Sequence, residues 1–474
     1  MKPLPQVIQG GMGIAVSSWK MAQAVSRAGG LGVVSGTAID SVIARRLQDG
    51  DTDGSVRRAL NAYPDQEFAK DALRRFFIEG GKAPETPYLL LPKMVLNPTE
   101  FATQFLVASN FVEVWLAREG HDGLVGINYL EKIQLATPAS IYGAMLAGAD
   151  YILMGAGIPS EIPRVIRELS KHEKTKISID VEAATAKYFQ SFDPTVVRGA
   201  QSVELHPPKF LAIISSHALA AYLNRNDEVR PDGFVIEGTS AGGHNAPPRG
   251  NTPIGADGQS QFSAKDDADI AKVKATGLPF WLAGGYSTPS KLKEAISLGA
   301  VGVQVGSIFA LCLESGITDA LRKQILEKIT NKSLKVVTDP HGSPTSFPFK
   351  YAELENTISD SDEFSGRVKL CDLGYLRTVV ERPGQRIAYR CSGEPDKTFH
   401  FKGGEVGATA EKKCLCNALM ANIGMPQVRA SGYVEHALVT LGSDLSGEEA
   451  LLAIYPNGWS ALDAVRFLSA PDRR

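Results

Sequence analysis

Eight short apolar runs recur along residues 1–310, and each ends in a small or polar residue before a stretch with helical spacing. The runs end near Gln9, Ser35, Asn128, Gly155, Ser216, Glu237, Gly284 and Gly306. Continuous apolar runs, as opposed to alternating ones, are typical of strands buried on both faces of a parallel sheet. Eight such strand–helix units predict an α/β protein built on a (β/α)8 TIM barrel.

The structural alternative is a doubly wound open sheet, which also alternates strands with helices. Two observations favour the barrel. Every apolar run ends in small or polar residues, and no Gly-x-Gly-x-x-Gly fingerprint opens the chain. In a TIM barrel all the strand ends meet at one mouth, where active sites lie.

Two segments do not follow this alternation of apolar runs and helical stretches. Residues 40–120 are too long for one crossover helix, and they contain an apolar segment at 88–95 between helical stretches. Residues 334–474 follow the eighth unit and end in two amphipathic helices between 445 and 468. We therefore predict a barrel over 1–333 with a helical insertion at about 40–120, and a C-terminal extension over 334–474.

The composition limits the class of partner. The chain has 474 residues, of which 43% are hydrophobic and 22% charged, with a net charge of −2. These values are ordinary for a soluble globular protein and give no electrostatic reason to expect nucleic acid or an anionic membrane. No apolar run reaches the ~18 residues of a membrane span. Five cysteines in so long a chain do not suggest a secreted disulfide framework, so we expect a cytoplasmic protein, with a homodimer left open.

The sixth strand leads into a loop with the sequence Gly242-Gly243-His244. Adjacent glycines let the backbone approach a flat or anionic ligand that a Cβ would exclude, and a histidine exchanges a proton near neutral pH. Arg249 follows two prolines and is suited to hold an anionic substrate. The competing interpretations are an idle loop histidine and a surface ion pair for Arg249.

The ends of the seventh and eighth strands carry a second signal. TIM barrels usually hold phosphate groups there. In this chain the two ends are Ala283-Gly284-Gly285 and Gly306-Ser307, and each is followed by helical sequence. Backbone N–H groups at a helix start attract phosphate, so the pair of sites predicts a phosphate-bearing cofactor. One glycine pair alone would indicate only a turn.

These motifs together resemble the nitronate monooxygenase family, formerly called 2-nitropropane dioxygenases. The shared stretches are Val7-Ile8-Gln9-Gly10-Gly11-Met12, Ala28-Gly29-Gly30-Leu31-Gly32, the His244 loop, Leu282-Ala283-Gly284-Gly285 and Gly302-Val303-Gln304-Val305-Gly306-Ser307. FMN-dependent enoyl-ACP reductases of the same superfamily also have them. The resemblance implies a barrel that binds FMN non-covalently at the carboxyl ends of its strands.

By this resemblance His244 is the catalytic acid or base. The cofactor-binding residues that it implies are Gly10, Gly11 and Met12 near the isoalloxazine, Asn128 and Ser216 near the ring or ribityl chain, Gly284, Gly285, Gly306 and Ser307 at the phosphate, and also Gly242, Gly243, Ala283 and Gln304. The chain departs from the family pattern in the enlarged 40–120 region, the C-terminal extension and the Asn245-Ala246-Pro247-Pro248-Arg249-Gly250 segment after the histidine. The last departure touches the substrate pocket.

The function that we expect is FMN-dependent oxidation of alkyl nitronates by O₂ to a carbonyl compound and nitrite. The main alternative is an NAD(P)H-dependent enoyl reductase of lipid or polyketide synthesis, with NAD(P)H as co-substrate. A third is a non-catalytic flavin-binding protein whose extension is an interaction module.

Four of the five cysteines gather in the extension, at Cys371, Cys391, Cys414 and Cys416. Four reduced thiols suit a tetrahedral zinc site or an iron–sulfur cluster, although this spacing matches no standard finger or ferredoxin. Buried or redox-active thiols are the alternative. The sequence predicts that the four sulfurs converge in space.

Overall fold

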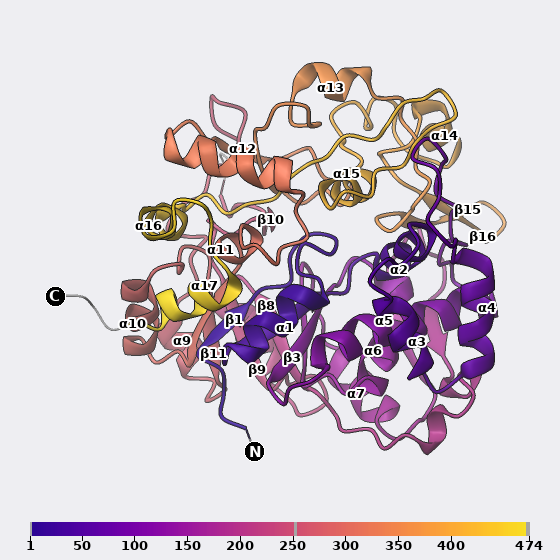
Figure 1. Cartoon of the computed structure of the whole chain (residues 1–474), viewed down its shortest axis with the longest axis horizontal. Helices are drawn as coiled ribbons and strands as arrows, with labels where there is room; N and C mark the ends of the chain where they lie inside the picture. The colour runs from indigo at the N-terminus through magenta and orange to yellow at the C-terminus, as the bar shows by residue number, and fades with distance from the viewer. Residues whose placement is uncertain (1, 251–253, 471–474) are drawn as a thin grey trace.

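Eight parallel strands close into a barrel in the computed structural model, which describes residues 2–250 and 254–470. The strands are β1 (Val7–Gln9), β2 (Leu31–Ser35), β3 (Leu124–Leu130), β4 (Tyr151–Gly155), β8 (Lys209–Ile214), β9 (Gly233–Glu237), β11 (Phe280–Ala283) and β12 (Gly302–Val305). Their order around the barrel is β1-β12-β11-β9-β8-β4-β3-β2. The predicted (β/α)8 barrel is confirmed (Figure 1).

The barrel strands are apolar throughout because each one contributes to two apolar regions. Alternate side chains, among them Ile8, Val33, Leu153 and Trp281, fill the inside of the barrel. The intervening ones pack outward against the helices. Trp281 is fully buried, and its indole N–H donates to the carbonyl of Pro5 at 2.7 Å, which ties the seventh strand to the entry of the first.

Helices surround the barrel between the strands. They are α1 (Trp19–Arg27), α6 (Thr137–Leu146), α7 (Ile162–Leu169), α8 (His217–Leu223), α9 (Ile270–Lys274), α10 (Pro289–Ser297) and α11 (Ser307–Ala310), with the short 3₁₀ helix η1 (Gln134–Ala136) before α6. No helix in residues 2–250 or 254–470 has both the length and the apolar character that crossing a membrane requires.

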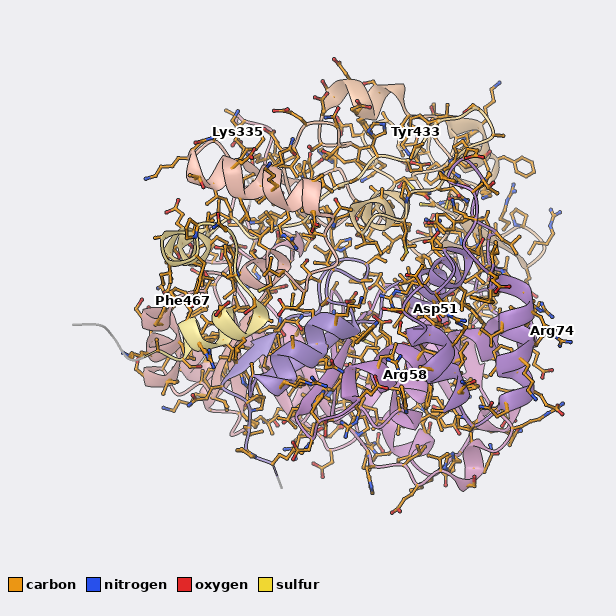
Figure 2. The ribbon with its side chains drawn as sticks, in the orientation of Figure 1. Asp51, Arg58, Arg74, Lys335, Tyr433 and Phe467 are labelled. Atoms are coloured by element: carbon orange, nitrogen blue, oxygen red, sulfur yellow. The ribbon has the colours of Figure 1, made fainter. Side chains whose placement is uncertain are left out.

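The connection from β2 to β3 contains four helices. These are α2 (Ile39–Gln48), α3 (Ser55–Asn61), α4 (Gln66–Phe76) and α5 (Glu100–Arg118). Asp51 is buried and accepts hydrogen bonds from the backbone N–H groups of Val56 and Arg57, both at 3.0 Å, so it fixes the start of α3. Figure 2 shows Asp51 inside the molecule and Arg74 of α4 at its outer edge. The apolar segment at 88–95 forms neither helix nor strand.

Small sheets join the barrel connections to the C-terminal extension. Strand β10 (Gly243–His244) pairs with β14 (Phe349–Ala352), which pairs with β13 (Val336–Asp339). Strand β6 (Val181–Glu182) pairs with β15 (Thr378–Arg382), which pairs with β16 (Arg386–Arg390). A separate hairpin joins β5 (Thr175–Ile179) to β7 (Tyr188–Phe192), followed by η2 (Pro194–Val196) and η3 (Ala200–Ser202). Two sheets contain strands from both sides of residue 333. The division of the chain into two domains at that residue therefore stays a prediction.

The extension lies over one end of the barrel, in orange to yellow in Figure 1. Its helices are α13 (Ser361–Gly366), α14 (Asp396–Phe401), α15 (Leu415–Asn422), α16 (Ser446–Ile454) and α17 (Ala461–Leu468), and α12 (Asp319–Thr330) precedes it. Helix α17 packs on α1 and α10, and α16 packs on α12. Between them Trp459 is fully buried, and its N–H donates to the carbonyl of Ile308 at 2.8 Å. The two expected terminal helices are therefore present and dock on the barrel.

Candidate active site

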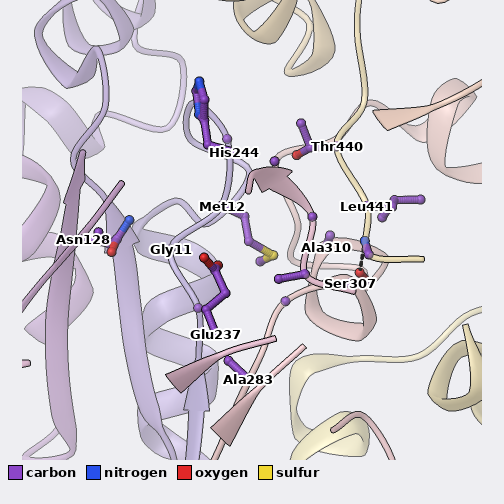
Figure 3. Close-up of a pocket in the computed structure, with 18 of the residues that line it drawn as sticks. Gly11, Met12, Asn128, Glu237, His244, Ala283, Ser307, Ala310, Thr440 and Leu441 are labelled. Carbon is purple, nitrogen blue, oxygen red and sulfur yellow. Dashed lines mark hydrogen bonds between the residues drawn. The ribbon is translucent and has the colours of Figure 1, made fainter. Parts of the chain in front are cut away.

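A cavity of about 240 Å³ opens at the carboxyl ends of the barrel strands (Figure 3). Thirteen of the residues predicted from the sequence line it: Gly10, Gly11, Met12, Asn128, Gly242, Gly243, His244, Ala283, Gly284, Gly285, Gln304, Gly306 and Ser307. The barrel topology brings them together from four strand ends and the loop after β9. Their roles toward a ligand remain a prediction.

The C-terminal extension supplies the far wall of the cavity. The lining residues from this part include Phe349, Tyr375, Leu376, Leu415, Cys416, Leu419, Thr440, Leu441, Gly442, Asp444 and Glu448. The backbone N–H of Gly442 donates to the hydroxyl of Ser307 at 2.8 Å, which fastens this wall to the eighth strand end. Sequence reasoning did not place these residues at the active site, although it named Cys416 as a candidate metal ligand, because local patterns carry no signal for contacts between positions more than a hundred residues apart.

One end of the cavity has the backbone that a phosphate group needs. Gly284 and Gly285 have φ values of +78° and +76°, in the left-handed region that favours glycine. A Cβ on Gly284 would lie 2.9 Å from the carbonyl oxygen of Gly238. Ser307 begins α11 directly after Gly306, so backbone N–H groups of two loops are available here.

The part of the cavity near Gly11 and Asn128 has a close backbone approach and unsatisfied polar atoms. A Cβ on Gly11 would lie 2.3 Å from the Cβ of Asn128, so only glycine fits between the first and third strands. The side-chain oxygens of Asn128 and Gln304 are buried, and neither has a hydrogen-bond partner in the described part of the chain. Buried acceptors of this kind are costly unless a ligand supplies donors. A flavin ring, which is flat and carries an N–H group on its edge, fits these features.

His244 is held at the mouth by the extension. Its Nε2 is 2.9 Å from the hydroxyl of Ser343, and its ring meets the Phe349 ring edge-on with centroids 4.8 Å apart. Burial lowers the pKa of His244 to about 4, because the charged imidazolium loses its water. The imidazole is therefore neutral at physiological pH.

Glu237 and Lys350 form a titratable pair beside the histidine loop. Burial raises the pKa of Glu237, the last residue of β9, to about 7, and the nearby Lys350 partly opposes that shift. Burial lowers the pKa of Lys350 to about 8, and its ammonium donates to the carbonyl of Thr239 at 2.7 Å. Lys350 lies opposite Gly243 in the β10–β14 pair. The sequence could have indicated Glu237 as a site residue, because it is the polar end of a barrel strand. Lys350 is recognised as a site residue only through its pairing with Gly243.

Glu448 is a second buried acid in the cavity wall. Its side chain is fully buried, and neither carboxylate oxygen has a partner in residues 2–250 or 254–470. Burial raises its pKa to about 8, and the charges of Asp444 and Glu449 add to the shift. Glu448 is therefore mostly protonated at neutral pH and can donate a hydrogen bond into the cavity.

Two of the predicted positions, Ser216 and Arg249, are not among the residues that line this cavity. The Ser216 hydroxyl accepts from the N–H of Leu219 and caps α8. The Arg249 guanidinium donates to the carbonyls of Ser215 and Lys265, at 3.0 and 3.1 Å. Both side chains form hydrogen bonds with nearby backbone groups, and the substrate role of Arg249 and the cofactor role of Ser216 stay predictions.

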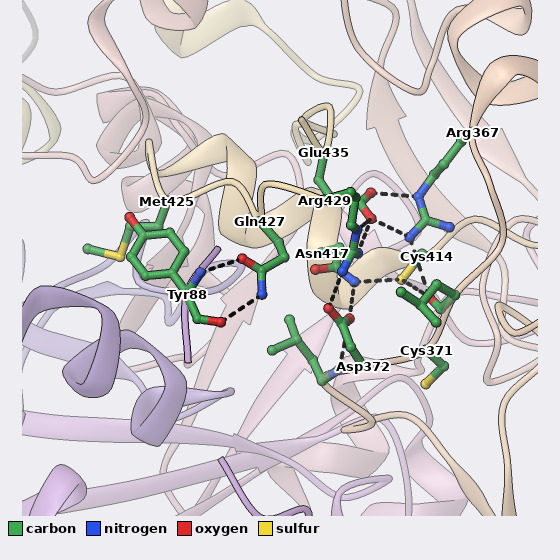
Figure 4. Close-up of polar contacts among 12 residues, drawn as sticks. Tyr88, Arg367, Cys371, Asp372, Cys414, Asn417, Met425, Gln427, Arg429 and Glu435 are labelled. Carbon is green, nitrogen blue, oxygen red and sulfur yellow. Dashed lines mark hydrogen bonds and ion pairs between the residues drawn. The ribbon is translucent and has the colours of Figure 1, made fainter. Parts of the chain in front are cut away.

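The four cysteines of the extension come near one another without forming a ligand set. A hydrogen bond with Cys391 lowers the pKa of Cys371, and the same contact raises that of Cys391. Cys414 accepts from the amide of Asn417 at 3.5 Å (Figure 4), and Cys416 lines the active-site cavity. Within the described residues no group of three or more His, Cys, Asp or Glu side chains could hold a metal ion. Zinc or an iron–sulfur cluster at these cysteines stays a prediction without structural support.

Part of the chain is similar to a known protein family. Residues 165–345 match the family model described as nitronate monooxygenase. A probable nitronate monooxygenase from Bacillus subtilis is 34% identical over 99 residues, or 20% of this chain and 26% of that protein. The nitronate monooxygenase from Pseudomonas aeruginosa is 35% identical over 98 residues, or 20% of this chain and 25% of that one. The chain thus matches about a quarter of the length of these curated relatives.

Two solved structures align over nearly the whole chain. FabK from Thermotoga maritima has a TM-score of 0.46 at 15% identity, covering 98% of this chain and 91% of that one. A nitroalkane oxidase from Streptomyces ansochromogenes has a TM-score of 0.43 at 13% identity, covering 98% and 94%. The family match over 165–345 includes four barrel strands, β8, β9, β11 and β12, and the His244 loop. The resemblance to the nitronate monooxygenase family is therefore confirmed over this part of the chain.

Proposed function

We propose that this protein is an FMN-dependent oxidoreductase that oxidises alkyl nitronates with O₂ to a carbonyl compound and nitrite. The observation that carries the proposal is the cavity itself. It combines two glycine loops suited to a phosphate, two buried unpaired oxygens suited to a flavin edge, and a neutral histidine. The family match over 165–345 and the two curated relatives named nitronate monooxygenase support it.

FMN would supply the redox chemistry, taking electrons from the substrate and passing them to O₂. The backbone N–H groups near Gly285 and Ser307 would hold its phosphate. A protonated Glu448 would donate to the same end of the ligand without adding a negative charge. Asn128 and Gln304 would accept from the ring edge and so fix its orientation.

The pKa of His244 favours a nitronate over a neutral nitroalkane as the substrate. A histidine with a pKa of about 4 is a weak base near neutral pH, and removing a proton from carbon calls for a stronger one. A nitronate has already lost that proton. The neutral imidazole would donate a hydrogen bond to an anionic oxygen of the nitronate, while Ser343 holds the ring.

A second candidate is the NAD(P)H-dependent enoyl reductase, and one observation favours it. Glu237 lines the cavity with a pKa of about 7, so it could deliver a proton to a substrate carbon after reduction. The two reactions differ in what reduces the flavin, which makes them separable by experiment.

The deciding experiment is a visible spectrum of the purified protein followed by anaerobic mixing. We expect a yellow protein that releases one FMN per chain on heating and is bleached by ethyl nitronate. Bleaching by NADH or NADPH alone would select the enoyl reductase. A colourless protein that takes up no FMN would reject both.

Replacement of His244 by alanine tests its role. We expect FMN binding to persist, because backbone groups hold the phosphate, and kcat/KM to fall by ~10²-fold, the usual cost of removing a hydrogen-bond donor to an anionic oxygen. His217→Ala is the matched control, because His217 lies outside the cavity and accepts from the N–H of Asp269. Equal activity in the two variants would remove His244 from the mechanism.

A further inference from the structure

A second cavity, of about 290 Å³, lies beside the active site. Tyr375 and Leu376 line both cavities, so they form a common partition. Most of the second cavity is built from the insertion and the extension, at residues 40–41, 90–94, 344–347 and 372–379. The parts that interrupt the regular barrel therefore create this space next to the reacting centre.

A buried polar network holds the partition in place. Asp372 forms an ion pair with Arg429 and accepts from the amide of Asn417 at 2.6 Å (Figure 4). Glu435 pairs with both Arg429 and Arg367, and the side chains of Arg367 and Glu435 are only 5% and 1% exposed. A network in which each charge has a partner makes its surroundings rigid. The wall is thus preformed before any ligand binds.

The partition is also tied to the insertion. The hydroxyl of Tyr375 donates to the carboxylate of Asp40 at 2.6 Å and lies 2.5 Å from the hydroxyl of Ser41. Both partners belong to α2, which follows the second barrel strand. The Tyr375 ring is therefore fixed from the barrel side as well as from the extension.

The lining of the second cavity is amphipathic. Its apolar side chains include Leu91, Met94, Ile133, Phe347, Leu373 and Val379. Lys93 donates to the carbonyl of Cys371 at 2.9 Å, and Arg377 donates to the carbonyls of Gly374 and Met94, at 2.8 and 2.6 Å. Within the described residues neither side chain has a carboxylate in ion-pair range.

The carboxylates of this cavity do not cancel those two cations. Asp372 is neutralised by Arg429, and burial raises the pKa of Asp40. Asp180 is exposed and accepts from the amide of Gln134 at 3.3 Å. Lys132 also lines the cavity, but it is paired with Glu131 at 3.4 Å, so Lys93 and Arg377 are the cations left unpaired in this lining. An apolar chamber with unpaired cations suits a ligand that has a hydrocarbon chain and an anionic end.

We propose that the second cavity binds the distal part of an elongated substrate whose reactive carbon lies in the first cavity. The hydrocarbon chain lies along Tyr375 and Leu376, which line both cavities, and Lys93 and Arg377 bind a carboxylate or phosphate at its far end. The substrate class is thus a long-chain, terminally anionic molecule. The turnover arm of the test below rests on the proposed function, and the binding arm does not.

Leu91→Trp tests the chain site, because it fills the second cavity without touching the first. Leu89→Trp is the matched control, since Leu89 is 59% exposed and lines neither cavity. Each buried methylene contributes ≈ 0.8 kcal/mol, so excluding a few of them should lower kcat/KM for octyl nitronate by ~10-fold or more. Turnover of ethyl nitronate should not change in either variant.

Lys93→Gln tests the anionic end. We expect the wild type to prefer octyl nitronates that end in carboxylate or phosphate over the plain octyl compound, and the variant to lose this preference. The two end groups show which anion the site selects. Lys82→Gln is the control, because Lys82 lies in the same insertion but lines neither cavity.

A binding measurement keeps the inference independent of turnover. Decyl phosphate should bind to the purified protein in calorimetry, more weakly to the Leu91→Trp and Lys93→Gln variants, and unchanged to the two controls. Equal binding by all five proteins, or no binding by the wild type, would overturn the inference. If ethyl nitronate is not turned over and no flavin is present, the proposed function fails instead.

Discussion

Glu448 shows how a single buried acid makes stability depend on pH. Its pKa of about 8 in the folded protein lies above the ordinary value of 4.5, so the folded state binds more protons than the unfolded state between these values. Stability should therefore fall as pH rises from 4.5 to 8 and then level off. Each pKa unit corresponds to ~1.4 kcal/mol, so the total is several kcal/mol.

Glu448→Gln should remove this pH dependence. Thermal melts of the flavin-free protein should show the variant gaining stability over the wild type as pH rises to 8, with the difference vanishing below 4.5. Glu449→Gln is the matched control, because Glu449 is the exposed neighbour on the same helix. If the melting temperatures of the wild type and Glu448→Gln changed with pH in the same way across this range, the raised pKa of Glu448 would be contradicted.

At the residue scale, the positions that the barrel backbone fixes were the predictable ones. Gly11, Asn128 and Gln304 lie at or next to strand ends, and the topology turns such positions toward the mouth. Ser216 and Arg249 are also close to strand ends, but nearby backbone groups take their side chains. The direction in which such a side chain points depends on hydrogen-bond partners that the local sequence motif does not contain.

At the scale of elements, Trp459 links the terminal helices to the barrel. It joins α16 to α17 and donates to the carbonyl of Ile308, one residue after Ser307 at the expected phosphate site. Trp459→Ala should lower the free energy of unfolding by ~3–5 kcal/mol, because it leaves a large cavity. It should also weaken FMN binding, because α11 loses its support.

Trp459→Phe separates the two contributions. It keeps a six-membered aromatic ring at this position, leaves a smaller cavity than alanine, and loses the hydrogen bond, which is worth ~1 kcal/mol. Denaturant unfolding and FMN titration of both variants measure the effects. An alanine variant as stable as the phenylalanine variant would show that the terminal helices do not support the barrel.

Among the elements, the barrel strands and terminal helices were predictable because each shows its own periodicity. Strands β10 and β6 were not, since each consists of two residues that become strands only by pairing with β14 and β15. The apolar segment at 88–95 is not a buried element, since only Tyr88 in it is buried. It has no regular structure, and part of it lines the second cavity.

For the whole molecule, the extension completes the active site. The sequence predicts an extension over 334–474, but its docking over the barrel mouth depends on contacts between distant residues. Ser343 and Phe349 hold His244, Gly442 binds Ser307, and Leu415 and Leu441 close the cavity. The barrel mouth without them would expose apolar side chains and leave His244 unsupported.

A fragment of residues 1–333 should therefore fail to form the site, although it contains all eight barrel strands. We expect it to aggregate or to remain flavin-free, because its mouth is open and the buried faces of α1, α10 and α11 are uncovered. Co-expression with residues 334–474 as a separate chain should restore part of the flavin binding, since the two small sheets and the Trp459 contact can form between chains. Size-exclusion chromatography with absorbance at the flavin bands measures both outcomes. A soluble, flavin-loaded fragment with normal nitronate turnover would show that the barrel is an independent domain and that the extension only modifies its substrate range.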